Sequence, residues 1–303
     1  MPQIQTILVP TDFSDFAAHA FDLALDLARR HHAEIHLLHT IHEIDVRTWD
    51  WITVTMPKEE EEIREELEAD NAQQLATFVA EHDTRGVKVL PVTQWGRAPA
   101  EAIVAYAGEM SADLIVIGSH GRRGLRRMLV GSVTEEVVHT APCPVLVAHV
   151  PEPASAPVRR ILVPTDFSAS GVPALEWAET LASGYGARLV LLHVLEDFAP
   201  MEPYEVTFGT LIDEVLPQME EYAQKELERT AATLAGKGLD VETHVVHGRP
   251  ADAILDFAGD QDIDLLAMAS HGRTGLERLL LGSVAARVMR SAPCPVLIVK
   301  PRS

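Results

Sequence analysis

Residues 118–146 read GSHGRRGLRRMLVGSVTEEVVHTAPCPVL, and residues 269–297 read ASHGRTGLERLLLGSVAARVMRSAPCPVL. Each copy carries a glycine, nine further residues, and then Gly-Ser at a predicted helix start, at Gly131 in the first copy and Gly282 in the second. A glycine-rich loop that leads into a helix can bind phosphate through its backbone N–H groups. The stretch therefore predicts a domain that occurs twice and handles a nucleotide.

The repeat extends beyond this loop and predicts two domains. ILVPTDFS occurs at 7–14 and again at 161–168, and GRAPA at 96–100 is echoed by GRPA at 248–251. An internal repeat of this length is a whole domain, and 303 residues suffice for two domains that each bury a core. We predict domains over 1–150 and 159–303, joined by a linker over 151–158 whose prolines favour an extended spacer.

Composition disfavours several classes of protein. The chain is 47% hydrophobic and 23% charged, as is usual for a soluble globular protein. No apolar run reaches the ~18 residues of a membrane span, and the N-terminal MPQIQTILVP lacks the regions of a secretory signal. A formal charge of −20 disfavours nonspecific nucleic-acid binding, which needs a basic surface. We therefore expect a cytoplasmic protein with neither a nucleic-acid nor a membrane partner.

The two cysteines occupy matching positions in the repeated segment APCPVL, at Cys143 and Cys294. Matching positions predict two reduced, buried thiols with a structural role. A bridge between them stays open at this stage, because it would require the two halves to meet there.

Apolar runs of strand length alternate with helical patterns along both halves. The predicted strands are Thr6–Val9, Glu34–Ile41, Val87–Val92, Leu114–Ile117 and Val145–Ala148, then Ile161–Val163, Leu189–Val194, Val241–Val246, Leu265–Met268 and Val296–Val299. Helices are predicted from Ser14, about Pro57, Pro99 and Ser132, and from near Ser168, Asp213, Pro250 and Ser283. The acidic run KEEEEIREELEAD is expected to form a solvated helix face. The pattern predicts an α/β fold with two tandem open parallel five-stranded sheets, of order 3-2-1-4-5, with helices on both faces.

The two repeated motifs are expected to meet in space. In an open parallel sheet a ligand binds beyond the carboxyl ends of the strands, where the strand order reverses. Asp12 follows the first predicted strand and Gly118 ends the fourth, and these strands are neighbours in a 3-2-1-4-5 order. Each half therefore predicts one crevice at which both motifs converge.

Both halves resemble universal stress protein domains, and the whole chain resembles the tandem two-domain members of that family. The family's nucleotide-binding pattern is a glycine, two residues, a glycine, nine residues, a glycine, and then Ser or Thr. Gly118, Gly121, Gly131 and Ser132 match it completely. Ala269 departs from it in the second half, where its methyl group could keep the backbone from a phosphate or forbid a positive φ. The implied fold is adenine nucleotide alpha-hydrolase-like.

The resemblance implies that each crevice holds ATP, AMP or ADP, with Mg²⁺ carried on the phosphates and no dedicated protein metal site. The glycine-loop backbone would contact the phosphates, Asp12 the ribose, and the region of Thr40 the adenine. The implied nucleotide-binding residues of the first half are Pro10, Thr11, Asp12, Thr40, Gly118, His120, Gly121, Arg122, Arg123, Gly131, Ser132 and Val133. Those of the second half are Pro164, Thr165, Asp166, Val194, Gly272, Arg273, Gly282, Ser283 and Val284.

Simpler roles stay open for several of these residues. Ser132 followed by Glu135 fits a capping box that needs no ligand, and Asp12 or Asp166 could cap the following helix or turn. The arginines of the glycine loops would attract phosphate or lie in a solvated loop. They number four in the first loop, at positions 122, 123, 126 and 127, against two in the second, at 273 and 278. We therefore predict tighter ATP binding at the first site.

Three functions follow as hypotheses. The first is a nucleotide-binding stress-response regulator. Its two domains would form the pseudo-twofold pair that single-domain members of the family make by dimerising, with residues 144–147 paired to residues 295–298. A further homodimer of whole chains is an open alternative. The second is a slow ATPase or nucleotidyl-transfer enzyme, which the loop disfavours because it lacks the Gly-Lys-Ser/Thr ending of a P-loop. No pairing of a nucleophile with a base is predicted, and no residue is assigned as catalytic. The third is an interaction protein without nucleotide, which the intact first loop disfavours.

Overall fold

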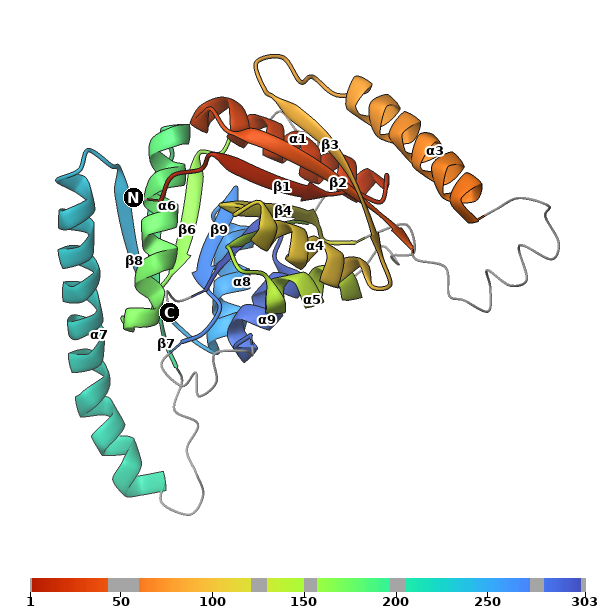
Figure 1. Cartoon of the computed structure of the whole chain (residues 1–303). Coiled ribbons are helices and arrows are strands. Elements are labelled where there is room, and N and C mark those ends of the chain that lie inside the picture. The colour runs from red at the N-terminus through yellow and green to blue at the C-terminus, as the bar shows by residue number, and fades with distance from the viewer. Residues whose placement is uncertain are drawn as a thin grey trace. The chain divides into compact units, whose positions relative to one another are not determined.

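The computed structural model describes residues 2–42, 60–120, 130–149, 157–196, 205–272 and 281–300, with the backbone alone at 60 and 205–214. It divides into two compact units, residues 3–154 and residues 155–303 with 1–2, called here the N-terminal and C-terminal units (Figure 1). The domain boundaries and the linker over 151–158 stay a prediction, since 150–156 lie outside the described residues. Among the described residues, no helix is both long and apolar enough to span a bilayer.

The N-terminal unit alternates strands and helices as predicted. Its elements are β1 (Thr6–Pro10), α1 (Asp15–His31), β2 (Glu34–His42), α3 (Glu60–Ala80), β3 (Val89–Gly96), α4 (Pro99–Glu109), β4 (Leu114–Gly118), α5 (Ser132–Thr140) and β5 (Val145–Ala148). The strands lie in the order β3-β2-β1-β4-β5, and their ladders are parallel. Because β1 lies between β2 and β4, the strand order reverses beside it.

The C-terminal unit repeats this arrangement. Its elements are β6 (Arg160–Pro164), the short 3-10 helix η1 (Ala169–Gly171), α6 (Val172–Tyr185), β7 (Arg188–Leu195), α7 (Glu205–Ala235), β8 (Val241–His247), α8 (Pro250–Asp260), β9 (Leu265–Ala269), α9 (Ser283–Ser291) and β10 (Val296–Val299). The strand order is β8-β7-β6-β9-β10, again with parallel ladders. The predicted 3-2-1-4-5 order is thus confirmed within each unit, whereas the detail of two separate sheets is not confirmed.

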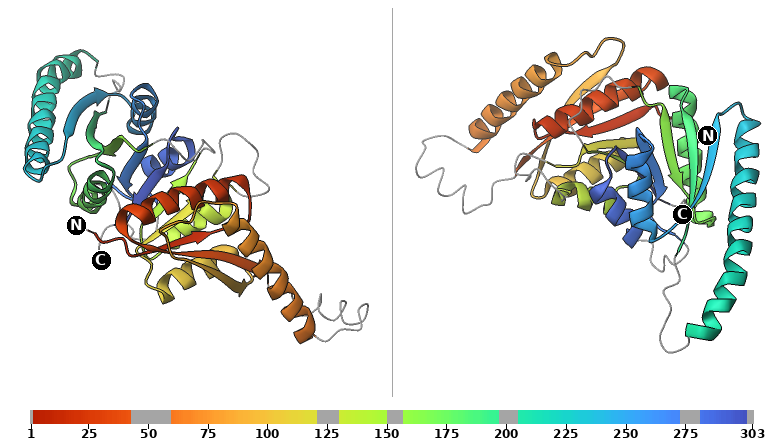
Figure 2. Two further views of the ribbon diagram at one scale, coloured as in Figure 1. Left: turned by 90° about the horizontal axis from the view of Figure 1, so that it is seen from above. Right: turned by 180° about the vertical axis from the view of Figure 1, so that it is seen from behind.

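The strands are buried because helices cover the sheet. All five residues of β4 and all four of β5 are buried, as expected for parallel strands covered on both faces. On one side α1 packs against α3, with the rings of Phe21 and Phe78 5.8 Å apart, whereas α4 packs against α5. Figure 2 shows the same layering from two further sides, with the long helix α7 alongside β8 in the C-terminal unit.

Helix α1 begins as the sequence predicts. Ser14 is its N-cap and accepts a hydrogen bond from the backbone N of Ala17 at 3.3 Å. One apolar face of this helix, from Ala17 to Ala28, is buried. The acidic face of α3 is solvated, also as predicted, since Glu61, Glu62, Glu65 and Glu66 are exposed.

Three predicted boundaries are wrong. Strand β3 covers 89–96 rather than 87–92, and α7 begins at Glu205 rather than near Asp213. Helix α6 begins at Val172 rather than near Ser168, because η1 intervenes. Pro173 then lies in the first turn of α6, where its missing N–H leaves no hydrogen bond unmade.

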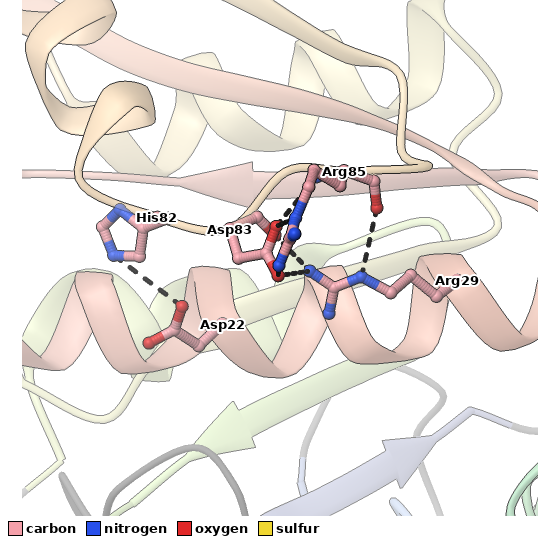
Figure 3. A network of polar contacts seen from close by, with 5 residues as sticks. All are labelled: Asp22, Arg29, His82, Asp83 and Arg85. Carbon is pink, nitrogen blue, oxygen red and sulfur yellow. Dashed lines mark hydrogen bonds and ion pairs between the residues drawn. The ribbon is translucent and has the colours of Figure 1, made fainter.

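A polar cluster on the surface fastens the end of α1 to the turn after α3 (Figure 3). Arg29 donates to the carbonyl oxygens of Asp83 and Arg85, and Arg85 donates to the Asp83 carboxylate at 2.8 Å and 2.9 Å. These hydrogen bonds hold the pKa of Asp83 below its usual range. Nearby, His82 Nε2 lies 3.9 Å from Asp22 Oδ1, and burial raises the pKa of Asp22 although His82 opposes the shift. Exposed ion pairs contribute little to stability individually. We therefore attribute the connection between α1 and the turn after α3 mainly to the hydrogen bonds that Arg29 donates to backbone carbonyls.

The prediction of two buried thiols is correct for one cysteine only. Both cysteines are free, and Cys294 is buried with 5% of its surface exposed. The prediction of a buried thiol is wrong for Cys143, which is half-buried. Burial, reinforced by the nearby Asp264 charge, raises the pKa of the Cys294 thiol to about 12.

We therefore expect the two thiols to differ in reactivity. Since the thiolate is the reactive form, iodoacetamide at pH 8 should modify Cys143 roughly ten times faster than Cys294, or more. Peptide mass spectrometry against time measures both rates, and labelling in urea provides the reference in which both thiols react alike. Equal rates in the folded protein would show that Cys294 is not shielded.

Candidate functional site

The two repeated motifs meet in each unit. In the C-terminal unit, the Oδ2 atom of Asp166 lies 2.8 Å from the position that a Cβ atom on Gly272 would occupy. In the N-terminal unit, the Phe16 ring at the start of α1 lies 5.0 Å from the ring of His120, between centroids. The Asp166 turn of the C-terminal unit and the start of α1 in the N-terminal unit therefore contact the segment after the fourth strand, at the reversal of strand order where ligands bind in such sheets.

The turn after β1 is held by its own polar groups. Thr11 is buried, and its backbone N donates to the Leu38 carbonyl at 2.8 Å. The Oδ1 atom of Asp12 accepts from the backbone N of Ser14 at 3.2 Å and from its hydroxyl at 2.6 Å. Asp166 accepts likewise from the backbone N of Ser168 at 2.9 Å. Both aspartates therefore have a structural role within their turns.

Gly118 is required by packing. A Cβ atom there would lie 2.9 Å from the backbone C and O atoms of Phe16, closer than real Cβ contacts come. Among the described residues, neither Gly118 nor its counterpart Ala269 has a positive φ. The concern that Ala269 would meet a forbidden φ is therefore unfounded. Ala269 ends β9, which is opposed by η1, whereas Gly118 lies against the first turn of α1.

Gly131 and Gly282 are the N-caps of α5 and α9. Each backbone N donates across the loop at 2.8 Å, from Gly131 to the Ser119 carbonyl and from Gly282 to the Ser270 carbonyl. Ser132 is the first helical residue rather than the N-cap, so the capping box that its spacing to Glu135 suggested does not form. The glycine cap of each helix thus provides no side chain to bond the first N–H groups.

No described residue requires glycine at the Gly131 cap, whereas the packing around the Gly282 cap is tight. The φ angles are −64° at Gly131 and −60° at Gly282, which any residue adopts. A Cβ on Gly131 would lie 3.6 Å from the nearest atom, an ordinary contact, and one on Gly282 would lie 3.2 Å from the Ser270 oxygen. The absence of a side chain leaves the first turn of each helix open to a group that approaches its N–H donors closely.

Two serine–histidine contacts were not predicted from the sequence. Ser119 Oγ lies 3.0 Å from His120 Nδ1, and Ser270 Oγ lies 2.9 Å from His271 Nδ1. Ser119 is fully buried, and its hydroxyl donates to the His149 carbonyl at 3.2 Å. Because that proton is committed, His120 Nδ1 donates to Ser119, and the pair is no nucleophile with its base. The Nε2 atom of His120 is buried and has no hydrogen-bond partner in the described part of the chain.

The remaining predicted residues lie in strands and in the first turns of helices, or lie outside the described ranges. Pro10 and Pro164 end β1 and β6 and pair with Leu38 and Leu192. Thr40 lies in β2 with its methyl carbon 3.7 Å from the Cβ position of Gly96, and Val194 pairs with Val246. Val133 and Val284 follow the serines in the first turns of α5 and α9. Gly121, Arg122, Arg123 and Arg273 lie outside the described residues, as do the other arginines of the two loops.

An open pocket of about 410 Å³ lies on the α3 side of the same turn. It is lined by Phe13 and by one face of α3, with residues Asp70, Gln73, Gln74, Thr77, Phe78 and Glu81. None of the predicted nucleotide-binding residues lines it. Among the described residues, no group of three or more His, Cys, Asp or Glu side chains is placed to hold a metal ion.

Comparison with known proteins places the chain among relatives of matching architecture. The model of the universal stress protein family matches twice, over residues 3–149 and 157–300. A universal stress protein of Mycolicibacterium smegmatis is 31% identical over 302 residues, which cover 98% of this chain and 97% of the relative. One from Methanocaldococcus jannaschii is 37% identical over 144 residues, or 47% of this chain and 82% of the relative. The crystal structure of a universal stress protein from Archaeoglobus fulgidus superposes with a TM-score of 0.69 at 23% identity, covering 99% of this chain and 97% of that one, and shows a shared fold.

Proposed function

Since the chain belongs to the universal stress protein family, we propose that it is a stress-response regulator that binds an adenine nucleotide in the crevice of each unit. The nucleotide is ATP, ADP or AMP, with Mg²⁺ entering on the phosphates. Binding would alter the conformation or the protein partners of a cytoplasmic protein. The duplicated units would form an intramolecular pseudo-twofold pair through 144–147 and 295–298, with a further homodimer of whole chains open.

One observation carries this proposal, namely the two helix starts with glycine caps. Both α5 and α9 begin at a glycine whose φ any residue adopts, with exposed Ser132 and Ser283 next in the chain, and a Cβ atom on Gly131 would make only an ordinary contact. The first N–H groups of a helix carry a partial positive charge and point away from it. A phosphate group satisfies those donors, and a side chain at either glycine would stand in its way.

Other groups of the crevice suit the rest of a nucleotide. The carboxylates of Asp12 and Asp166, each held in place by its own turn, would accept hydrogen bonds from ribose hydroxyls. Thr40 and Val194, near the ends of β2 and β7, would flank the adenine. The arginines of both loops would add attraction for phosphate. His120 Nε2 would gain a hydrogen-bond partner, which offsets the free energy lost by burying it unpaired.

Hydrolysis is not the expected activity. The loops carry no lysine fixed against the β and γ phosphates. The Ser119 hydroxyl donates its proton to the His149 carbonyl, so His120 does not act as a base toward that hydroxyl. Slow ATPase or nucleotidyl transfer is therefore the weaker hypothesis, and a role without nucleotide is weaker still.

We expect the purified chain to bind adenine nucleotides with dissociation constants on the order of micromolar, as a phosphate site with specific sugar contacts allows. Mass spectrometry of the acid-released contents tests for nucleotide carried from the cell, and calorimetry with ATP, ADP, AMP and GTP tests affinity and base preference. Phosphate release should stay at the buffer rate. Failure to find bound nucleotide in both experiments would refute the proposal, and rapid release of phosphate would favour the enzyme hypothesis.

A further inference from the structure

Strand β3 in the N-terminal unit and strand β8 in the C-terminal unit form matching outer edges, and they differ at one position. Each pairs with a single strand among the described residues, β3 with β2 and β8 with β7. The first paired residue is Val89 in β3 and Val241 in β8. Pro91 and Thr243 therefore occupy equivalent places, two residues further along. Proline protects an edge strand from pairing with another chain, and β8 contains none.

The backbone of β8 directs alternate residues away from β7. Leu189 donates its backbone N–H to the Asp240 carbonyl at 2.9 Å and pairs with Val241. In a parallel ladder this pattern turns the even-numbered residues of β8 toward β7 and the odd-numbered ones outward. The N–H and C=O groups of Thr243 therefore point away from the ladder, and none of the seven residues of β8 is buried. At the same place in β3, Pro91 has no N–H to donate.

Side-chain chemistry selects one register if β8 pairs with β8 of a second copy as antiparallel strands around a twofold axis. With Thr243 at the axis, the two Thr243 residues exchange backbone hydrogen bonds, and Glu242 of each copy faces His244 of the other. Opposite Cα atoms at such non-hydrogen-bonded places lie about 4.5 Å apart, so carboxylate and imidazole can bond across the strands. With His244 at the axis, the two imidazoles would face each other, and Glu242 would face Val246.

Glu242 and His244 already lie side by side on one face of β8. His244 Nε2 is 2.6 Å from Glu242 Oε1, and 32% and 30% of the two side chains are exposed. The His244 ring packs against Phe257 of α8, with centroids 4.9 Å apart. Arg160 and Arg188 lie 3.3 Å and 3.6 Å from Glu242 Oε2. Both groups are therefore held in place before a second strand arrives, which lowers the entropy lost on pairing.

We propose that β8 is an interface at which two copies of this chain pair edge to edge as antiparallel strands, with Thr243 at the twofold axis. The inference does not depend on nucleotide binding, and it assigns the open homodimer of whole chains to one strand of the C-terminal unit. One strand from each copy makes a small interface, so the dimer should dissociate with a constant on the order of 10 to 100 µM.

Thr243→Pro tests whether the outward N–H group carries the interface. Sedimentation velocity of the whole chain without nucleotide, from about 1 to 200 µM, measures the dissociation constant. The variant should raise that constant at least roughly tenfold, because proline removes hydrogen bonds at the axis. The fold should survive, since this N–H lies outside the ladder with β7 and β3 carries Pro91 at the equivalent place. Thr243→Val keeps the N–H and is the matched control, which should dimerise as the unchanged chain does.

Disulfide formation tests the register independently of the proline variant. In a Cys143→Ser background, Thr243→Cys places two thiols at the axis, with Cα atoms about 5.5 Å apart, and oxidation should give a covalent dimer. Val245→Cys shifts each thiol from its twin by about 13 Å along the strand and should not give one.

Three results would overturn the interface. They are an unchanged chain that stays monomeric at the highest concentration, a folded Thr243→Pro chain that dimerises normally, and a Val245→Cys chain that cross-links as readily as Thr243→Cys. Thermal unfolding establishes that each variant is folded, and the cysteine pair decides the question should the proline variant unfold. A monomeric chain that binds ATP would refute this inference and leave the proposed function standing, whereas a dimer without nucleotide affinity would do the reverse.

Discussion

Gly131→Asp should weaken nucleotide binding at the N-terminal crevice about 100-fold, because a carboxylate would then stand at the open helix start where a phosphate is expected. Like charges brought together at an interface cost several kcal/mol, and about 2.8 kcal/mol corresponds to this loss. The fold should survive, since the φ of −64° suits any residue and the new Cβ would lie 3.6 Å from its nearest neighbour. Calorimetric titration with ATP, together with thermal unfolding, measures both quantities.

Gly108→Asp is the matched control for this change. Gly108 lies in α4, and a Cβ there would have nothing within 4 Å, so the same charge is added away from the crevice. ATP affinity should then change less than about twofold, as screened surface charges allow. A Gly131→Asp chain that binds ATP as tightly as the Gly108→Asp chain would remove the helix start of α5 from the site.

The same substitution in the C-terminal unit tests the predicted difference between the sites. Gly282→Asp should reduce total ATP binding less than Gly131→Asp, because the first loop carries four arginines and the second carries two together with Glu277. Gly259→Asp, where a Cβ also has open space around it, is the corresponding control. Equal losses from the two glycine-cap variants would refute the prediction that the first site binds more tightly.

Gly118→Ala should lower the free energy of unfolding of the N-terminal unit by about 3 kcal/mol, the upper range for overpacking a dense interior. The added methyl carbon would lie 2.9 Å from two backbone atoms of Phe16, and backbone in the first turn of α1 cannot move aside as a flexible side chain can. Urea unfolding followed by circular dichroism measures the loss. Nucleotide affinity should fall as well, since α1 begins directly after the Asp12 turn.

Two variants show whether the effect belongs to Gly118 alone. Gly131→Ala adds the same methyl group within ordinary contact distance and should change the free energy of unfolding by under about 1 kcal/mol. Ala269→Gly tests the counterpart position, where a methyl group is already accommodated, and should destabilise by about 1 kcal/mol through lost packing and added chain entropy. If Gly118→Ala were as mild as Gly131→Ala, the close approach of Phe16 would not be a constraint on this residue.

Much of the fold follows from patterns that lie close together in the chain. The alternation of apolar strands with helical stripes predicts the order β3-β2-β1-β4-β5 and its repeat, because chirality and strand burial leave few alternatives. The cap at Ser14 is correctly predicted because it involves one turn of one helix. Boundaries failed where tertiary contacts decide them, as at α6, whose start is shifted by η1 opposite β9.

The candidate site likewise combines features that the sequence predicts with features that only tertiary contacts decide. The amino-acid sequence by itself determined the duplication, the family and the reversal of strand order, since repeats, motif spacing and the alternation of elements can all be read along the chain. Only the tertiary structure decided that Gly118 serves packing against Phe16, that Gly131 replaces Ser132 as the cap, and that His39 fastens the Asp12 turn. Those contacts join residues from different elements, and their distances depend on how helices and strands pack, which no local pattern encodes.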